Sequence, residues 1–419
     1  MKPAYAVCIA TSVVGLAWAS PAPAAPAYEA NTLIVKYADG TSSTQRSLTG
    51  RLAGVLQTLG HVRGIGAQVV RVSGDPAAAA ARLNRASSVL YAEPNYIAHA
   101  TGIPDDARFD EQHGLHNTGQ SGGEPDADID APEGWTALFG ATSFPASGGA
   151  KIGIVDTGVM ADHEDLTGKV VDCVGVRTSG IDVLGIITLP LFADPTIVPG
   201  RCVDDNGHGT HVAGIAAAIA NNGRGIAGVA FNSPLAICKA LGAGGGGAVA
   251  GVANCIGDLA ANGAKVISLS LGLSVDSAAL HDAVVAASDR ALIVAASGNG
   301  GNTTANYPAA YPEVVSVAAT DDSDQRAPFS TFNADVEVAA PGVDILSAWN
   351  DGGYLTASGT SMAAPYAAGV AAVVAERYPA GGPSLWRSKL DGAVDDLGPA
   401  GRDAQTGFGR VNLQQAATE

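Results

Sequence analysis

Three short segments of the chain contain side chains that could together break a carbonyl–heteroatom bond. The run IGIVD ends at Asp156, the segment NGHGTHVAG contains His208, and the segment GTSMAAP contains Ser361. A serine becomes an effective nucleophile when a base removes its proton, and histidine is such a base near neutral pH. A carboxylate on the far ring nitrogen fixes the histidine tautomer and stabilises the imidazolium. These residue types therefore predict nucleophilic catalysis, in the chain order Asp, His, Ser.

Each of these residues also has an interpretation without serine chemistry. Asp156 could be a structural acid at a strand end. It could also belong to an aspartic protease, but such a protease needs two Asp-Thr-Gly segments in an all-β fold, and this sequence contains one. His208 and His211 could bind a metal, but the sequence has no His-Glu-x-x-His segment. Ser361 could simply cap a helix, and it does not lie in a Gly-x-Ser-x-Gly elbow. The presence of all three residues together favours catalysis.

Apolar strands that alternate with alanine-rich helices are expected to bring these side chains together. Such alternation predicts a doubly wound α/β fold, with a parallel sheet flanked by helices on both faces. Strand carboxyl ends and helix N-termini meet at one rim of such a sheet, so residues 205 positions apart can meet there. A central helix is expected from Ser361 to Arg377, because this segment is apolar nearly all round. The expected strands are Lys151–Val155, Leu235–Cys238, Val266–Leu269, Leu292–Ala295, Val314–Ala318 and Val336–Ala339.

A smaller unit precedes this fold. Between Tyr28 and Ala100 the pattern predicts strand, helix, strand, helix, strand, which makes a small α+β domain of marginal stability on its own. Its β-rich runs lie at 32–37, 68–72 and 89–96, and a helical run lies at 77–86. A polar link rich in turn-forming residues follows, from Thr101 to about Asp130.

The extreme N-terminus has the pattern of a secretory signal. Lys2 is followed by an apolar run from Ala4 to Ala17, and small-x-small sites lie at 17–19 and 22–24. Prolines at 21, 23 and 26 argue against a buried helix here. We therefore expect residues 1–24 to be a signal peptide, and the protein to be secreted, either outside the cell or into a periplasm.

Four cysteines lie beyond this signal. An even number in an exported protein predicts disulfides, although four cysteines allow three connectivities and could also be free buried thiols. Short loops are the easiest to close, which favours the pairs Cys173–Cys202 and Cys238–Cys255. No Cys-x-x-Cys pair supports a zinc site.

Composition excludes several classes of protein. Of the 419 residues, 47% are hydrophobic and 15% are charged, and the formal net charge is −17. A large core is therefore available, and a nucleic-acid partner is excluded because phosphate binding needs clustered Lys and Arg. Beyond the N-terminus no apolar stretch reaches the roughly 18 residues of a membrane span. Residues 1–100 carry eight basic and four acidic side chains, against 15 and 36 in the remainder, so a basic segment precedes an acidic body.

The ordered motifs VDTG, HGTHVAG, SLG, ASGN and GTSMAAP resemble those of the subtilases, the subtilisin-like serine proteases. They extend over residues 152–365, and TGFGRVN near the C-terminus is also similar. The N-terminal unit resembles the inhibitory propeptide of that family, with the weaker motif YAEPN. The resemblance implies a precursor with a signal peptide (1–24), a propeptide (25–100) and a catalytic domain of subtilisin-like fold (101–419).

Roles follow for individual residues from this resemblance. Ser361 would be the nucleophile, His208 the general base and acid, and Asp156 its orienting carboxylate. Asn299 would donate to the oxyanion, together with the backbone N–H of Ser361. The two walls of the pocket for the side chain before the scissile bond would be Ser270, Leu271 and Gly272, and Ala296, Ser297 and Gly298. The first wall and the glycine-rich loop 242–247 would pair with the substrate backbone as with an added strand.

The resemblance also implies a structural calcium ion. Asp165 matches a ligand position of the family, and Asn221 and Asn222 lie where a family loop contributes further oxygen atoms. A plain turn at the end of a helix is the alternative for the two asparagines. Residues 168–201 form an insertion between Asp156 and His208, which could contact protein substrates or have no such role.

The sequence thus predicts a secreted serine endopeptidase that cleaves proteins and peptides broadly, with a preference for larger apolar side chains before the scissile bond. Its own propeptide is expected to inhibit it until the chain is cut between Asn95 and Asp106, and a monomer is expected. A catalytically silent binding protein of the same fold is the alternative from another class. An esterase with the same residues is a third, which protein substrates would distinguish.

Overall fold

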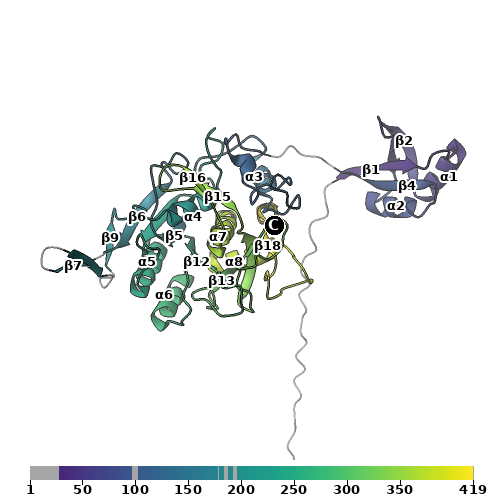
Figure 1. Cartoon of the computed structure of the whole chain (residues 1–419). Coiled ribbons are helices and arrows are strands. Elements are labelled where there is room, and N and C mark those ends of the chain that lie inside the picture. The colour runs from purple at the N-terminus through teal and green to yellow at the C-terminus, as the bar shows by residue number, and fades with distance from the viewer. Residues whose placement is uncertain (1–27, 97–101, 178, 184–186, 192–195, 419) are drawn as a thin grey trace, which may run out of the picture. The chain divides into compact units, whose positions relative to one another are not determined.

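The computed structural model describes residues 28–96, 102–177, 179–183, 187–191 and 196–418 (Figure 1). The chain divides into two compact units, Met1–His99 and Ala100–Glu419, referred to below as the N-terminal and the C-terminal unit. The expected signal peptide lies outside the described residues. No helix among the described residues combines the length and apolar character needed to cross a membrane.

The N-terminal unit is a four-stranded antiparallel sheet with two helices. Its core residues include Leu33 and Val35 on the central strand and Leu83 on a helix, all fully buried. The strand order is β2-β3-β1-β4. Its elements are β1 (Tyr28–Tyr37), α1 (Ser43–Leu52), β2 (Val55–Val62), β3 (Ala67–Val72), α2 (Pro76–Leu83) and β4 (Val89–Tyr96).

Strand β2 corrects the expected element order, which had no strand between the first helix and residue 67. Four consecutive residues, 56–59, are exposed, so the alternation of buried and exposed positions that marks a half-buried strand is absent. The ladder between β2 and β3 also shifts register twice. The strand exists because it pairs with β3, and sequence periodicity does not report such pairing.

The C-terminal unit is built on a ten-stranded sheet in the order β17-β18-β14-β13-β12-β11-β5-β10-β6-β9. All neighbouring pairs from β18 to β6 are parallel, while β17 and β9 run antiparallel at the two edges. The expected α/β fold is confirmed, with the two edge strands as an addition. The strands are β5 (Ile152–Asp156), β6 (Val170–Val176), β9 (Ile197–Pro199), β10 (Leu235–Lys239), β11 (Val266–Leu269), β12 (Leu292–Ala296), β13 (Val314–Thr320), β14 (Val336–Pro341), β17 (Val394–Asp395) and β18 (Arg410–Val411).

Helices cover both faces of this sheet (Figure 1). Helices α4 (His208–Ala217) and α7 (Thr360–Arg377) pack on one face, and α5 (Val249–Ala261) and α6 (Ala278–Ser288) on the other. Helix α7 is buried along nearly its whole length, as its apolar sequence predicts. The remaining helices are η1 (Phe109–Glu111), α3 (Ala131–Phe139), α8 (Gly382–Gly392) and α9 (Leu413–Thr418), and a hairpin of β15 (Ile345–Ala348) and β16 (Tyr354–Ala357) precedes α7.

Side chains along a strand alternate between the two faces of the sheet, and this alternation decides on which face the side chain of Asp156 lies. In β5, Ile152 and Ile154 belong to the core beneath α4 and α7, while Val155 belongs to the core beneath α5 and α6. Asp156 is the last residue of β5, so the period of two directs it to the α4–α7 side. His208 starts α4 and Ser361 is the second residue of α7, which brings the three segments to one rim of the sheet.

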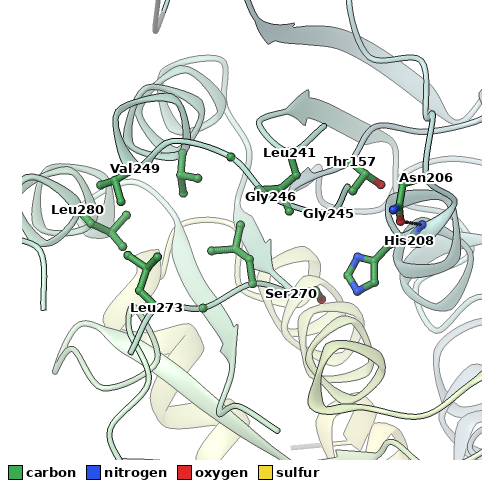
Figure 2. Close-up of a pocket in the computed structure, with 14 residues that line it drawn as sticks. Thr157, Asn206, His208, Leu241, Gly245, Gly246, Val249, Ser270, Leu273 and Leu280 are labelled. Atoms are coloured by element: carbon green, nitrogen blue, oxygen red, sulfur yellow. Dashed lines mark hydrogen bonds between the residues drawn. The ribbon is translucent and has the colours of Figure 1, made fainter. Parts of the chain in front are cut away.

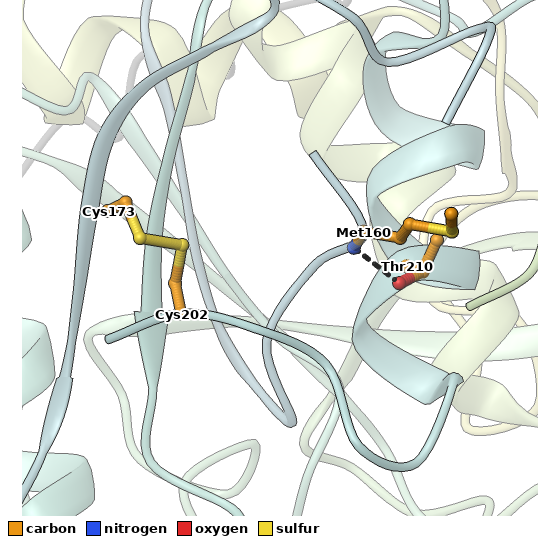
Figure 3. The surroundings of a disulfide bond; sticks show 4 residues. All are labelled: Met160, Cys173, Cys202 and Thr210. Carbon is orange, nitrogen blue, oxygen red and sulfur yellow. Dashed lines mark hydrogen bonds between the residues drawn. A yellow bond between two sulfur atoms is a disulfide. The ribbon is translucent and has the colours of Figure 1, made fainter. Parts of the chain in front are cut away.

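Both predicted disulfides are present. Cys173 in β6 is bonded to Cys202 (Figure 3), and Cys238 in β10 is bonded to Cys255 in α5. The first of them brackets most of the insertion 168–201. Within this insertion β9 adds an edge strand to the sheet, and β7 (Ser179–Val183) pairs with β8 (Ile187–Leu191) in a separate two-stranded hairpin (Figure 1).

Candidate active site

The imidazole of His208 is hydrogen-bonded to a buried carboxylate. Its Nδ1 lies 2.8 Å from Oδ1 of Asp156, whose side chain is 0% exposed, while the His208 side chain is 28% exposed. The same carboxylate oxygen accepts the backbone N–H of Thr157 at 2.7 Å. A carboxylate held at Nδ1 leaves Nε2 as the ring nitrogen that can exchange a proton with another group.

The charges around this pair change the basicity of the imidazole. Burial acts to lower the pKa of His208, but the charge and hydrogen bond of Asp156 and the charge of Asp204 outweigh it, and the net pKa lies above the usual value. Burial lowers the pKa of the neighbouring His211 to about 4, so this second imidazole is neutral near pH 7. Its Nε2 lies 2.9 Å from the carbonyl oxygen of Leu355, which gives it a structural partner.

Ser361 lies in the first turn of α7, and its hydroxyl donates to the carbonyl oxygen of Ser270 at 3.3 Å. The hydroxyl of Ser270 in turn donates to the carbonyl oxygen of Ser361 at 2.8 Å. A serine hydroxyl has one hydrogen, so transfer of this proton to His208 requires the hydroxyl to turn away from Ser270. A hydrogen bond between a nucleophilic hydroxyl and its base is often long or poorly aligned until substrate binds.

Asn299 is oriented by its neighbour at the start of α7. Its Oδ1 accepts both the backbone N–H and the hydroxyl of Thr360, each at 2.9 Å. With the oxygen engaged in this way, the Nδ2 group remains on the opposite side as a donor. The first-turn N–H groups of a helix have no partner inside the helix, so the start of α7 adds further donors close to Asn299.

A cavity of about 300 Å³ adjoins His208 (Figure 2). Its end near His208 and Asn206 is polar, and its far end is formed by apolar side chains. Ser270–Gly272 and Gly245–Gly247 line it, as expected for one substrate wall and the glycine-rich loop. The apolar lining residues are Leu241, Val249, Val252, Leu271, Leu273 and Leu280.

The second predicted wall, Ala296–Gly298, does not line this cavity. A residue that sequence reasoning missed lies between the two walls instead: Asn306 donates from Nδ2 to the carbonyl oxygen of Ala296 at 3.1 Å. A Cβ at Gly272 would lie 2.2 Å from that same amide nitrogen, so the Asn306 side chain fills the space beside this glycine. Nothing in the sequence motif surrounding Asn306 indicates this position.

The predicted calcium ligands come together only in part. Asp165, fully buried, accepts the side-chain amide of Asn222 at 2.9 Å on Oδ1 and the hydroxyl of Tyr354 at 2.7 Å on Oδ2. The side-chain oxygen of Asn221 instead accepts the backbone N–H of Asp105 at 3.2 Å. Among the described residues there is no group of three or more His, Cys, Asp or Glu side chains arranged to hold a metal.

A second buried carboxylate, which sequence reasoning missed, adjoins this region. Asp106 is 6% exposed and accepts the backbone N–H of Asn221 at 2.7 Å. Burial, to which the charge of Asp165 adds, raises the pKa of Asp106 to about 6. The amide and hydroxyl groups that donate to Asp165 and Asp106 are neutral and leave the carboxylate charges uncompensated, so a hard cation with oxygen ligands fits this donor set.

Comparison with known proteins places these features in a family. Residues 147–409 match the sequence profile of the subtilase family, and residues 18–95 match that of the fervidolysin N-terminal prodomain. The chain is 42% identical to thermitase of Thermoactinomyces vulgaris over 289 residues, which are 69% of this chain and 93% of thermitase. It is 37% identical to the thermophilic serine proteinase of Bacillus sp. (strain AK1) over 339 residues, 80% of this chain and 74% of that protein.

Two solved structures are also similar. The S41 psychrophilic protease has a TM-score of 0.57 and 35% identity, over 67% of this chain and 97% of that one. A protease from Pseudoalteromonas arctica has a TM-score of 0.60 and 28% identity, over 75% of this chain and 98% of that one.

Proposed function

The chain belongs to the subtilase family of serine endopeptidases, and on that premise we propose that Ser361, His208 and Asp156 form its catalytic triad. The observation that carries the proposal is the 2.8 Å hydrogen bond between Nδ1 of the partly exposed His208 and the fully buried Asp156, beside a substrate-sized cavity. A buried carboxylate in this place keeps the imidazole in the tautomer that accepts a proton at Nε2.

The mechanism follows from these positions. Oγ of Ser361 attacks the carbonyl carbon of the scissile peptide bond while Nε2 of His208 takes the hydroxyl proton. Asp156 stabilises the resulting imidazolium, and the side-chain amide of Asn299 and the backbone N–H of Ser361 donate to the oxyanion. His208 then gives the proton to the leaving amine, and an acyl-enzyme remains. Water, activated by the same imidazole, hydrolyses this ester and restores the serine.

The lining of the cavity supports a broad specificity for apolar side chains. Ser270–Gly272 and the glycine-rich loop present backbone groups to an extended substrate, while the leucine and valine side chains of the far end present an apolar surface. We expect large apolar side chains to be preferred before the scissile bond. A peptide panel tests this, and equal or faster cleavage after Lys or Arg would contradict it.

Residues 25–100 are proposed to inhibit the enzyme until they are removed, after export directed by residues 1–24. The match of the N-terminal unit to a subtilase prodomain supports this role, and the opposite charges of the two parts favour their association. We propose a cut between Asn95 and Asp106. Isolated propeptide is expected to inhibit mature enzyme at micromolar concentration, and no inhibition at that level would contradict the role.

A structural calcium ion is proposed beside Asp165 and Asp106, with oxygen atoms from the loop that contains Asn222. The ion would neutralise two buried carboxylates that would otherwise repel each other. Chelation of calcium is therefore expected to lower the unfolding temperature, and added calcium to restore it. In the variant Asp165→Asn the unfolding temperature should no longer depend on calcium. The control variant Asp289→Asn, which changes the C-cap residue of α6, should keep this dependence.

The decisive test compares casein hydrolysis at mildly alkaline pH by the mature protein and by Ser361→Ala. We expect a loss of about 10⁶-fold in kcat with the fold intact. Equal activity of both proteins would place the nucleophile elsewhere. An inactive wild type without its propeptide would favour the silent binding protein, and hydrolysis of small esters without any cleavage of casein would favour the esterase.

A further inference from the structure

A buried carboxylate two residues beyond the Cys202 disulfide organises the turn that leads into α4. Asp204 is 7% exposed. Its Oδ1 accepts the backbone N–H groups of Asn206 at 3.0 Å and Gly207 at 2.9 Å, and its Oδ2 accepts the backbone N–H and the hydroxyl of Thr210 at 2.9 and 2.6 Å. The carboxylate therefore bonds to residues on both sides of His208, although it makes no hydrogen bond to the imidazole.

The same carboxylate is connected to the strand that ends at Asp156. The hydroxyl of Thr157 donates to Oδ1 of Asp204 at 2.9 Å and accepts the backbone N–H of Gly209 at 2.9 Å. Because Thr157 follows Asp156 directly and Gly209 follows His208, this hydroxyl fixes the separation of the two segments whose side chains form the 2.8 Å hydrogen bond.

Three further contacts hold the turn from outside. The hydroxyl of Thr210 accepts the backbone N–H of Met160 at 2.9 Å (Figure 3). On another side, a Cβ at Gly207 would lie 2.3 Å from the indole of Trp349, so this indole packs directly against the residue before His208. The side chain of Asn350 donates to the carbonyl oxygen of Asp204 at 3.3 Å. The turn is thus clamped, and Asp204 is its central acceptor.

We propose that Asp204 is a positioning residue for His208: it holds the imidazole at Asp156 without contact with substrate. The inference rests on the proposed role of His208 as the general base and extends it to a residue outside the triad. Misplacement of a reacting group by about 1 Å costs about 10²-fold in rate, so a turn held by so many bonds has a direct effect on catalysis.

The electrostatics support a second effect. Burial acts to raise the pKa of Asp204, but hydrogen bonds from Gly207, Thr210 and Asn206 outweigh it and hold the pKa below the usual value, so the group is charged at working pH. The charged or titratable groups that face His208 are Asp156 from β5, Asp204 from its own turn and His211 from α4. Removal of the negative charge of Asp204 therefore lowers the pKa of His208, so the imidazole stays neutral down to a lower pH.

The test compares Asp204→Asn with Asp205→Asn in the mature enzyme. Asp205 provides the matched control, because its side chain is 51% exposed and pairs with Lys239. The substitution Asp205→Asn removes the same charge one residue away from Asp204. We expect Asp204→Asn to lower kcat about 10²-fold with KM nearly unchanged, and to move the acid limb of kcat/KM to lower pH. Asp205→Asn should keep kcat within about twofold of the wild type, since surface substitutions have small effects. Equal behaviour of the two variants, or a lower unfolding temperature with an unmoved acid limb, would overturn the proposal.

Two measurements keep the proposal testable if Asp204→Asn does not fold. Thr210→Val removes one donor to Asp204 and leaves the charge, and should lower kcat, whereas Thr210→Ser retains the hydroxyl and should restore most of it. Equal kcat in these two variants would contradict the clamp. In the Ser361→Ala background, an NMR titration of His208 measures its pKa without activity, so a failure of the triad assignment is distinguished from a failure of the role of Asp204.

Discussion

The two units of the chain differ in how much of each strand they bury. In the C-terminal unit, β5, β12 and β14 are buried at every residue. In the N-terminal unit, by contrast, Leu52 is 86% and Leu56 67% exposed, and most of β2 faces outward. The C-terminal unit thus has a continuous core on both faces of its sheet. Among its described residues, the N-terminal unit instead keeps apolar side chains that nothing within that unit covers.

The largest effect is expected from core truncation in the smaller unit. Leu33→Ala and Ile154→Ala each empty a fully buried position, at a cost of about 2–5 kcal/mol. A unit of about 70 residues has a free energy of unfolding of roughly 4–10 kcal/mol, so Leu33→Ala removes much of it. The measurement is denaturant unfolding of the full chain in the Ser361→Ala background. Leu33→Ala should nearly abolish the unfolding transition of the N-terminal unit, whereas Ile154→Ala should leave the C-terminal unit folded. Equal tolerance of both units would refute the comparison.

A smaller effect, confined to the C-terminal unit, is expected from Asn299, the proposed oxyanion donor. Asn299→Ala should lower kcat by about 10²–10³-fold, because the amide donates only as negative charge develops on the oxygen. Inhibition of this variant by isolated propeptide should match that of the wild type. A rise in KM with kcat unchanged would assign Asn299 to ground-state binding instead.

The pH dependence of activity should also belong to the C-terminal unit alone. The pKa of His208 is raised above its usual 6.5, and only the neutral imidazole accepts the serine proton. Since a raised pKa keeps the ring protonated to a higher pH, kcat/KM should fall as the pH drops through a midpoint above 6.5. Initial rates on a small peptide with mature enzyme measure this midpoint; a value below 6.5 would mean that burial of the imidazole outweighs the charges of Asp156 and Asp204.

The smallest effect is expected at the exposed leucines of the N-terminal unit. Leu52→Ser should change the free energy of unfolding of that unit by less than about 0.5 kcal/mol, whereas Leu83→Ser, at a fully buried position, should unfold it. Comparable destabilisation by both variants would show that Leu52 is part of the core.

Sequence reasoning succeeded where one residue type in one local pattern decides the structure. The apolar run before Asp156 predicted β5, and short loop length selected the pair Cys173–Cys202. It failed where partners distant in the sequence decide: β2 exists through β3, and Asn306 and Asp106 acquire their places through contacts with residues 10 and 115 positions away. Asp204 lies only four residues before His208 in the sequence. Its hydrogen bonds to the turn nevertheless depend on a backbone conformation that residue spacing does not reveal.

The two disulfides close consecutive loops, 173–202 and 238–255, and neither loop contains Asp156, His208 or Ser361. Cross-links act largely by restricting the unfolded chain. The first lies between Asp156 and His208 and the second between His208 and Ser361, so each shortens the chain between two of these residues without positioning either of them. Asp156 and Ser361 must meet across 205 residues through parallel strand pairing, which is slow because distant contacts form only after large loops have closed. Oxidation therefore shortens these loops but does not form the strand pairing, and a correctly cross-linked chain can still lack the proposed triad. Disulfide content is therefore no measure of active enzyme, and titration of the reactive serine is the appropriate assay of folding yield.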